Sequence, residues 1–446
     1  MEIQTAAERG LLRNRSFLAL WSAQILSMTA ANALTSALIV LVAEITRSNT
    51  SSSFLILLAV IPAVVFGVFA GVVVDRSDRR LVLVTTNALR AVAVGVMLVF
   101  GDSLTSAYLV NLLVASVTVF FVPAEAATIP EIVRKRDLLI ANSLFTFTFN
   151  GAFLLGFIIL APLVIAFAGF PTLFATIMAM FGLAAALCVS LPASEPVKEA
   201  LGVDVAEVAV KRGRRDIGEA LRFLAQQPRI AWSLVYIAVT YTLIAVAGAL
   251  APGYVREVLL LPERSVALIV APAGIGVVAG LGLLNIARSC FGTGRAVGAG
   301  LAVTVVALIV LAAARPLALI AGRASEGGGL AGLPYFIGLV VLTAFVFGVA
   351  YAFITVPSMT LVQEELPDLI RGRVFGVLNV LVSVFSLLPI LVVGPVADIW
   401  GVAPVFLGAA ALVVGTWIGG RRHRAGAPGV ATDPNVIRDT GTQNVN

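Results

Sequence analysis

Residues 71–80 read GVVVDRSDRR, a charged turn between two long apolar runs. The run that leads into it, at about 54–74, and the run that follows, at about 81–101, are each long enough to cross a bilayer as an α-helix. Three arginines in the turn, Arg76, Arg79 and Arg80, favour a position on the cytoplasmic surface. The stretch therefore predicts two membrane-spanning helices joined by a short cytoplasmic turn.

The rest of the chain repeats this alternation of apolar runs and polar breaks. Of its 446 residues 60% are hydrophobic and 12% are charged, whereas a soluble domain is about half apolar and a quarter charged. This composition excludes an ordinary water-soluble enzyme, and at about 20 residues per span it supplies roughly twelve spans. We expect them at about 16–43, 54–74, 81–101, 105–124, 139–168, 171–192, 231–252, 264–288, 296–314, 333–357, 373–398 and 402–420.

One long polar stretch, Pro192 to Arg229, divides these spans into six and six. It contains KRGRRD at 211–216 and an amphipathic-looking EALRFLAQQ at 219–227. We therefore predict an all-α membrane protein with twelve transmembrane helices in two pseudo-symmetric six-helix bundles. The expected units are a cytoplasmic N-terminus (1–15), an N-terminal bundle (16–192), a cytoplasmic linker with an amphipathic helix (193–229), a C-terminal bundle (230–420) and a polar cytoplasmic tail (421–446).

Basic residues orient the predicted spans. Twelve spans place both termini on one side, and most of the 30 Lys and Arg residues then lie on that side. Because cytoplasmic loops carry the excess of Lys and Arg, we expect cytoplasmic termini in a multi-pass protein of the plasma membrane, the bacterial inner membrane. The net charge of +6 then reflects topology and not a nucleic-acid partner. The arginines left outside are Arg47, Arg256, Arg264, Arg315 and Arg323.

The two predicted halves echo each other. VPAEAATIPEIVRKRDL, from Val122, lies between spans 4 and 5, and VPSMTLVQEELPDLIRGR, from Val356, lies between spans 10 and 11. At one fixed offset Pro123 matches Pro357 and Glu131 matches Glu365. An internal repeat at equivalent places is typical of a duplicated transporter whose halves move about a central site. Chance similarity of two short loops is the alternative.

The turn at 71–80 resembles the signature that follows the second span in the major facilitator superfamily, G-x-x-x-D-R-x-G-R-R, with Asp78 in place of the second glycine. The resemblance implies that a gating motif locks and unlocks the cytoplasmic side during alternating access. Asp75 would lie near a neighbouring helix N-terminus, and Gly67 and Gly71 would form a small-residue packing face. A positive-inside anchor without gating is the alternative. The motif residues are Gly71, Asp75, Arg76, Arg79 and Arg80.

Further stretches are similar to the branch of this superfamily that includes the enterobactin exporter and macrolide efflux pumps. They are NRSFLALWSAQ at 14–24, AN at 141–142 and VPSMTLVQEELPDLIRGRVFGVLN at 356–379. Two departures stand out. GLLNIARSCFGTGR at 282–295 lacks the acidic counterpart of the first signature, which predicts asymmetric gating. Residues 30–32 read AAN where members often have an acidic residue, so the resemblance does not imply proton coupling through span 1.

Polar groups inside spans are costly in hydrocarbon and usually face the bundle interior, so they are the candidates for a substrate cavity. They fall on shared helical faces and lie beside phenylalanines, which predicts a weakly polar, aromatic cavity for an amphipathic organic molecule. The alternative for each polar side chain is a hydrogen bond between helices. The cavity candidates are Gln24, Asn32, Asn111, Asn142, Thr146, Phe149, Asn150, Tyr236, Thr240, Asn379, Ser383 and Ser386.

Two charged residues inside spans are candidates for proton coupling. Arg90 lies about ten residues into span 3, a depth of up to about 15 Å. Glu125, at the cytoplasmic end of span 4, shares a helical face with Asn111 and Thr118, and a carboxyl group that reaches the cavity can carry a proton. The alternatives are an ion pair of Glu125 with Arg134 or Arg136 at the membrane interface, and snorkelling of Arg90 to the surface.

Several chemistries are poorly supported. Two cysteines, Cys188 and Cys290, and one histidine, His423, build neither a disulfide framework nor a metal site. No P-loop motif occurs, and the glycine-rich GIGVVAG (274–280) and GTGRAVG (292–298) lie in or beside spans, where glycines serve helix packing. We expect no enzyme activity, no cofactor and no metal, so a gradient would supply the energy.

These observations predict a secondary active transporter that exports an amphipathic small molecule, a drug-like compound or a siderophore, by alternating access with proton antiport. Export rests mainly on the family resemblance. The alternatives are uptake or facilitated diffusion of a metabolite, and a non-transporting sensor on a degenerate carrier fold. The expected partners are the substrate, a proton or another coupling ion and the lipid bilayer, with no nucleic acid, and we expect a monomer.

Overall fold

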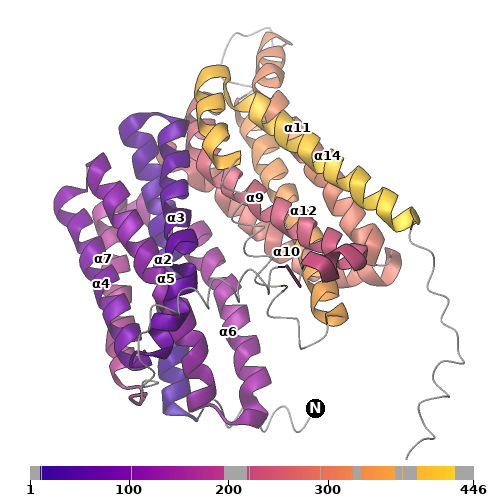
Figure 1. Cartoon of the computed structure of the whole chain (residues 1–446). Coiled ribbons are helices and arrows are strands. Elements are labelled where there is room, and N and C mark those ends of the chain that lie inside the picture. The colour runs from indigo at the N-terminus through magenta and orange to yellow at the C-terminus, as the bar shows by residue number, and fades with distance from the viewer. Residues whose placement is uncertain are drawn as a thin grey trace, which may run out of the picture.

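In the computed structural model, the described residues are 11, 13–101, 103–194, 218–219, 221–291, 293–324, 333–366, 374 and 389–426. All regular secondary structure in this part of the chain is helical. Ten helices there are long and apolar enough to cross a membrane, and a shorter apolar helix lies at Pro389–Trp400. The predicted all-helical membrane fold is confirmed (Figure 1).

The first half begins each of its early helices at a side-chain cap. Asn14, Ser48, Asp78 and Ser103 accept a hydrogen bond from the backbone N–H two or three residues on. Such caps satisfy donors that the first helical turn leaves free, which explains where the helices start. The helices are α2 (Arg15–Thr46), α3 (Asn49–Asp75), α4 (Arg79–Phe100), α5 (Leu104–Ile132), η1 (Lys135–Asp137), α6 (Leu138–Phe153), η2 (Leu154–Leu160) and α7 (Ala161–Val189).

The fifth and sixth predicted spans form one continuous apolar stretch, 140–189, with two irregularities. η2 is a π-helical segment, and Gly169 has φ +78°, which breaks α7 near its N-terminal end. A positive φ is readily adopted by glycine, so the chain changes direction between the spans at this residue.

The second half contains α9 (Pro228–Glu257), η3 (Glu263–Val266), α10 (Ala267–Phe291), α11 (Thr293–Ala324), α12 (Leu333–Glu365), the Pro389–Trp400 helix and α14 (Val402–Gly426). Of the eleventh predicted span, 373–398, residues 373 and 375–388 lie outside the described part. Ahead of α9, residues 221–226 of the predicted amphipathic segment are helical, and Leu224 is buried with Leu234 of α9 and Val362 of α12.

The two repeated stretches that begin at Val122 and Val356 were predicted to connect spans, but both begin inside a helix. The sequence prediction is wrong on this point. α5 continues through Pro123 and Pro130 to Ile132, and α12 continues through Pro357 to Glu365. Proline removes one backbone hydrogen bond, but neighbouring groups compensate within a membrane bundle, so such helices persist. The matched glutamates, Glu131 and Glu365, therefore occupy the last turns of two long helices.

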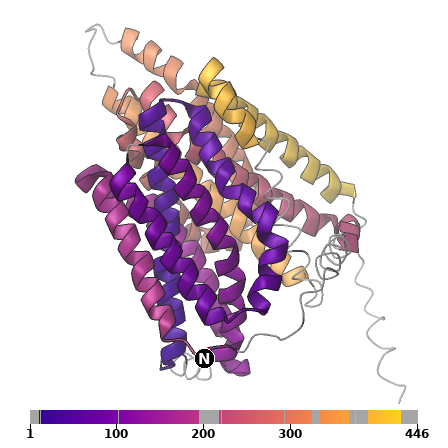
Figure 2. The same cartoon turned by 60° about the vertical axis from the view of Figure 1, so that its left-hand side comes forward.

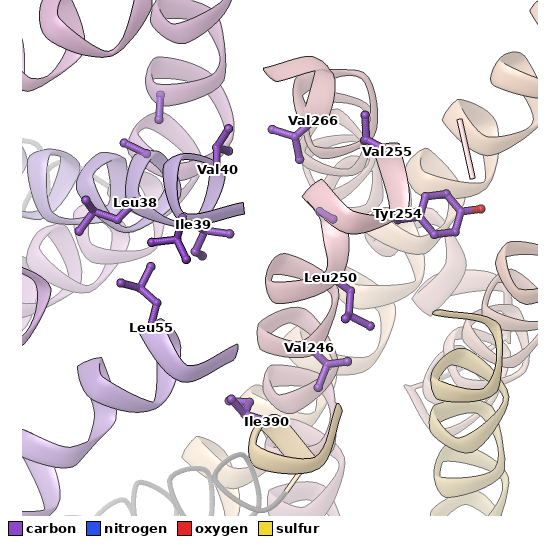
Figure 3. Close-up of a cluster of buried hydrophobic side chains, with 14 of the residues drawn as sticks. Leu38, Ile39, Val40, Leu55, Val246, Leu250, Tyr254, Val255, Val266 and Ile390 are labelled. Carbon is purple, nitrogen blue, oxygen red and sulfur yellow. The ribbon is translucent and has the colours of Figure 1, made fainter. Parts of the chain in front are cut away.

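Helices pack mainly within each half, and the halves lie side by side (Figure 1 and Figure 2). The contacts between them join α2 and α3 to α9, η2 to α10, and η3 to α7. A buried apolar cluster crosses this interface. Figure 3 shows Leu38 of α2 and Leu55 of α3 on one side, and Val246 and Leu250 of α9 on the other. Buried apolar side chains therefore hold the two halves together near the C-terminal end of α2.

Glycines in α10 allow close packing against α12, as expected for GIGVVAG. A Cβ at Gly276 would collide with the carbonyl oxygen of Phe345, and one at Gly348 would collide with that of Ala273. In contrast, a Cβ at Gly67 or Gly71 meets nothing within 4 Å. The expected packing face on α3 is therefore wrong for this conformation, because no neighbouring helix approaches these two glycines.

Gly276→Ala should destabilise the protein, because backbone atoms rather than a flexible side chain occupy the space of the new methyl group. Overpacking of this kind costs about 1–3 kcal/mol, or roughly 5 °C in apparent melting temperature. Thermal unfolding in detergent measures it. Gly282→Ala, on the same helix, is the matched control, since a Cβ there meets no neighbouring atom within 4 Å. Equal melting temperatures for the two variants would contradict the proposed close contact.

Candidate functional site

A buried polar cluster lies inside the first half, between α2, α4, α5 and α7. Arg90 of α4 has an exposed fraction of 0%. Its Nη1 donates to Oγ of Ser27 at 2.7 Å, and Ser27 donates to Oδ1 of Asn87 at 2.8 Å. The guanidinium group lies over the ring of Phe121, 4.5 Å from its centroid. A hydroxyl group and an aromatic face thus stabilise a charge that hydrocarbon alone would not tolerate.

Glu125 of α5 supplies the opposite charge. Its exposed fraction is 6%, and it interacts electrostatically with Arg90 without a direct ion pair. Oε1 of Glu125, and Nε and Nη2 of Arg90, have no hydrogen-bond partner among the described residues. The alternative that Arg90 snorkels to the surface is therefore wrong, because its side chain is fully buried. The alternative ion pair of Glu125 with Arg134 or Arg136 is not formed either. The structure brings the two proton-coupling candidates together, and each keeps polar atoms that could form further hydrogen bonds.

The signature turn is built differently from expectation. Asp75 has a side chain 65% exposed, and its described ion pair is with Arg79 at 3.9 Å, not with a helix N-terminus. Asp78 instead caps α4, since its Oδ1 accepts from the backbone N–H groups of Arg80 and Ser194. The residue that departs from the family signature therefore anchors the start of α4. Its place, two residues before the capped N–H, is a sequence signal that the motif comparison overlooked.

Each half has one ion pair between an arginine and the glutamate of its repeated stretch, at the end of the molecule opposite to the C-terminus of α2. Arg79 donates to the carboxylate of Glu131 and to the carbonyl oxygen of Ala127 at 3.0 Å. Arg229 pairs with Glu365 at 3.3 Å. Arg76 and Arg80 make no ion pair with described residues. Each half therefore neutralises its own echoed glutamate.

The cavity candidates of the first half mostly bond within that half. Nε2 of Gln24 donates to the carbonyl oxygen of Phe145 at 3.3 Å, and Nδ2 of Asn111 donates to that of Leu55 at 2.7 Å. These bonds join α2 to α6 and α5 to α3, as the alternative of hydrogen bonds between helices predicts. Asn32 bonds its own helix at Met28.

The remaining candidates are not brought to one place. Asn142 and Phe149 on α6 are exposed. Thr240 bonds the carbonyl oxygen of Tyr236 in its own helix, and Tyr236 is buried beside Trp232. The side chains of Thr146 and Asn150, and all of Asn379, Ser383 and Ser386, lie outside the described residues.

A polar contact between the halves, missed by the sequence analysis, lies where α2 ends and α3 begins. Asp398 accepts hydrogen bonds from the backbone N–H groups of Asn49 at 2.7 Å and Thr50 at 3.0 Å, and from the hydroxyls of Ser48 and Thr50, both at 2.7 Å. We call this set the Asp398 latch. A carboxylate of the second half thus sits at the N-terminus of a first-half helix, where it is favoured by the helix dipole.

Further polar contacts surround the latch. Arg264 donates to both carboxylate oxygens of Glu44, at 2.8 and 3.2 Å, and Asn49 donates to Glu257 at 3.1 Å. At the opposite end, the ion pairs of the described residues stay within one half. This conformation is therefore closed at the end that carries the Asp398 latch.

The sequence profile of the Major Facilitator Superfamily matches residues 20–389. The chain belongs to this superfamily. Among curated relatives, an uncharacterised transporter of this type, YfiS of Bacillus subtilis (strain 168), is 24% identical over 373 residues, which are 83% of this chain and 84% of YfiS. The multidrug efflux pump Tap of Mycolicibacterium fortuitum is 27% identical over 381 residues, 82% of this chain and 85% of Tap.

Solved structures of transporters share the fold. The nucleoside transporter NupG superposes with a TM-score of 0.63 at 15% identity, over 91% of this chain and 98% of NupG. A bacterial homologue of the iron transporter ferroportin in an inward-facing state gives a TM-score of 0.64 at 15% identity, over 92% and 99% of the two chains. At these identities the likeness establishes the fold alone, and with the family match it makes this chain a multi-pass membrane transporter.

Asp398→Asn should loosen the latch, because the neutral amide loses the charge that strengthens the bonds to the N-terminus of α3. Hydrogen exchange of the backbone amides at 49–53 should then be faster by about tenfold, for a loss of roughly 1.4 kcal/mol. Exchange mass spectrometry on the detergent-purified protein measures this.

The matched control is Glu364→Gln, which removes an exposed carboxylate near the end of α12, away from the latch. Its exchange at 49–53 should equal that of the unmodified protein. Unchanged exchange in Asp398→Asn would mean that the latch does not hold α3.

Proposed function

We propose that this protein is a secondary active exporter of amphipathic small molecules, a drug-like compound or a siderophore, driven by proton antiport. The observation that carries the proposal is the buried Arg90 and Glu125 pair, whose charges balance while three of its polar atoms stay unpartnered among the described residues. Such groups inside a span are expensive and usually functional. Export is supported by the similarity to Tap, a protein described as a multidrug efflux pump.

In this proposal the N-terminal six-helix bundle, 16–192, and the C-terminal bundle, 230–420, rock about a midplane site, with 193–229 as a cytoplasmic linker. We place the protein in the bacterial cell membrane with both termini in the cytoplasm. The Asp398 latch then closes the outer side, and substrate enters from the cytoplasm or the inner leaflet. A monomer contains both bundles and suffices for alternating access.

Glu125 is the proposed proton carrier. With Glu125 ionised, the cluster with Arg90 is neutral overall, whereas a proton on Glu125 leaves Arg90 without its counter-charge. An unbalanced charge is costly in a dry bundle, so protonation favours any conformation in which Arg90 gains water or another acceptor. In the conformation described here Arg90 has no exposure, so the ionised form of Glu125 is favoured, and a proton taken up from outside would be released once the carrier has returned to it.

Glu125→Gln should abolish gradient-driven transport, because an amide of similar size cannot titrate. The measurement is accumulation of amphipathic dyes and antibiotics in inside-out membrane vesicles, with and without a protonophore. The unmodified protein should accumulate a compound only without the protonophore, and the variant should show at least about a tenfold lower rate. Glu364→Gln, an exposed carboxylate on α12, is the matched control and should transport normally.

The outcomes separate the alternatives. Normal protonophore-sensitive transport by Glu125→Gln would place the coupling group elsewhere. Accumulation that ignores the protonophore would exclude proton antiport. No accumulation of any compound in inside-out vesicles, together with uptake of a metabolite in right-side-out vesicles, would establish an importer, and no transport in either would favour a sensor.

Asp75→Asn should slow turnover with substrate affinity nearly unchanged, if the signature turn gates the cytoplasmic side as we propose. Asp75 contacts only Arg79 among described charges here, so the variant should fold normally and act on the conformation that is closed at this end. Initial transport rates give turnover, and dye binding to detergent-purified protein gives affinity. A normal rate would remove Asp75 from the gating mechanism.

A further inference from the structure

A cavity lies between helices of the second half. It encloses about 320 Å³ between the start of α11 and the end of α14, with Tyr236 of α9 also in its lining. The main contacts of α11 and α14 are with each other and with α9, α10 and α12. Figure 1 shows both helices on the side of the molecule away from α2–α7. The cavity therefore lies mainly between two helices of the second half, on the side away from α2–α7.

Two arginines line this cavity, one from each helix. Arg295 of α11 and Arg421 of α14 are both exposed, and neither makes an ion pair with a described residue. The guanidinium group of Arg421 lies over the ring of Trp417, 4.4 Å from its centroid, which holds it in place. Two cations that line one cavity without a counter-charge repel each other, so the site favours an anion. Guanidinium groups are suited to phosphate oxygens because they donate two parallel hydrogen bonds.

The rest of the lining is apolar and follows α11 into the span. Val297, Leu301 and Ala302 continue from Arg295 along α11, while Gly298 leaves room opposite Trp417. A tryptophan beside arginines at a helix end is typical of the membrane interface. A charged rim with an aliphatic wall below it matches a phospholipid, whose phosphate would meet the arginines and whose acyl chain would follow α11. A small soluble anion would bind the arginines without contacting these apolar side chains.

We propose that the cavity between α11 and α14 binds an anionic phospholipid of the leaflet that faces the chain termini. The lipid bridges the two outer helices of the second half through Arg295 and Arg421. The sequence continues beyond Arg421 with Arg422 and Arg424, which add positive charge to the same end of the chain. The site is independent of the proposed export activity, since it requires only the membrane setting.

Native mass spectrometry of the full-length protein tests the proposal, with phosphatidylglycerol as the probe and phosphatidylcholine as the neutral comparison. The unmodified protein should retain phosphatidylglycerol and bind it at least about tenfold more tightly than does the R295Q/R421Q double variant. R134Q/R222Q removes two other exposed arginines, which make no ion pair with described residues, and should bind as the unmodified protein does. Equal binding by the two double variants would overturn the site.

A second variant keeps the charges and fills the space. Gly298→Leu projects toward Trp417, where a Cβ fits at 3.8 Å from Nε1, so the helix should fold while the cavity closes. It should also lose phosphatidylglycerol by about tenfold. Unchanged binding would mean that surface charge alone attracts the lipid. Competition by millimolar inorganic phosphate that displaces the lipid completely would identify a soluble-anion site and overturn the lipid proposal.

Discussion

The packing of the first half depends on one constraint, which is that a charged arginine is fully buried inside a helical membrane bundle. Arg90 can remain there because four helices meet around it: Ser27 accepts its hydrogen bond, Phe121 offers a ring face, and Glu125 provides the opposite charge. Removing Glu125 would leave an uncompensated charge in a medium with little water, and removing Ser27 or Phe121 would take away a contact that stabilises it. The positions of α2, α4 and α5 are therefore linked by electrostatic interactions as well as by apolar packing.

Alternating access needs two bodies that are each rigid and can separate, and the polar contacts are distributed accordingly. Within each half, Arg79 with Glu131 and Arg229 with Glu365 stabilise the end near the chain termini. Between the halves, the Asp398 latch and the Glu44–Arg264 pair lie at the other end. Ion pairs between partly exposed side chains, such as Glu44 with Arg264, are individually weak and reversible. Reversible bonds at the interface between the halves are what a rocking transporter requires.

The sequence predicted the helical membrane fold and the places of most spans because apolar length is a direct requirement of the bilayer. It also selected Arg90 and Glu125, since charge inside a span is conspicuous. It could not bring them together, because that depends on how α4 and α5 are rotated about their axes. The contacts between the halves could not be predicted from the sequence for another reason. Ser48 and Asp398 are 350 residues apart in the chain, and Glu44 and Arg264 are 220 apart. Only tertiary packing joins them. The loop boundary near Pro123 was wrong because proline is a weaker helix breaker in a bundle than in water.

The long separation between α3 and Asp398 also orders the events of biosynthesis. When α3 leaves the ribosome, its N-terminus has only the side chain of Ser48 as a cap, because the carboxylate that completes it is not yet synthesised. Domains of large proteins generally fold in the order in which they are made. The first half must therefore insert and fold with this helix end unfinished, and the late synthesis of Asp398 makes closure of the end that carries the latch one of the last steps of maturation.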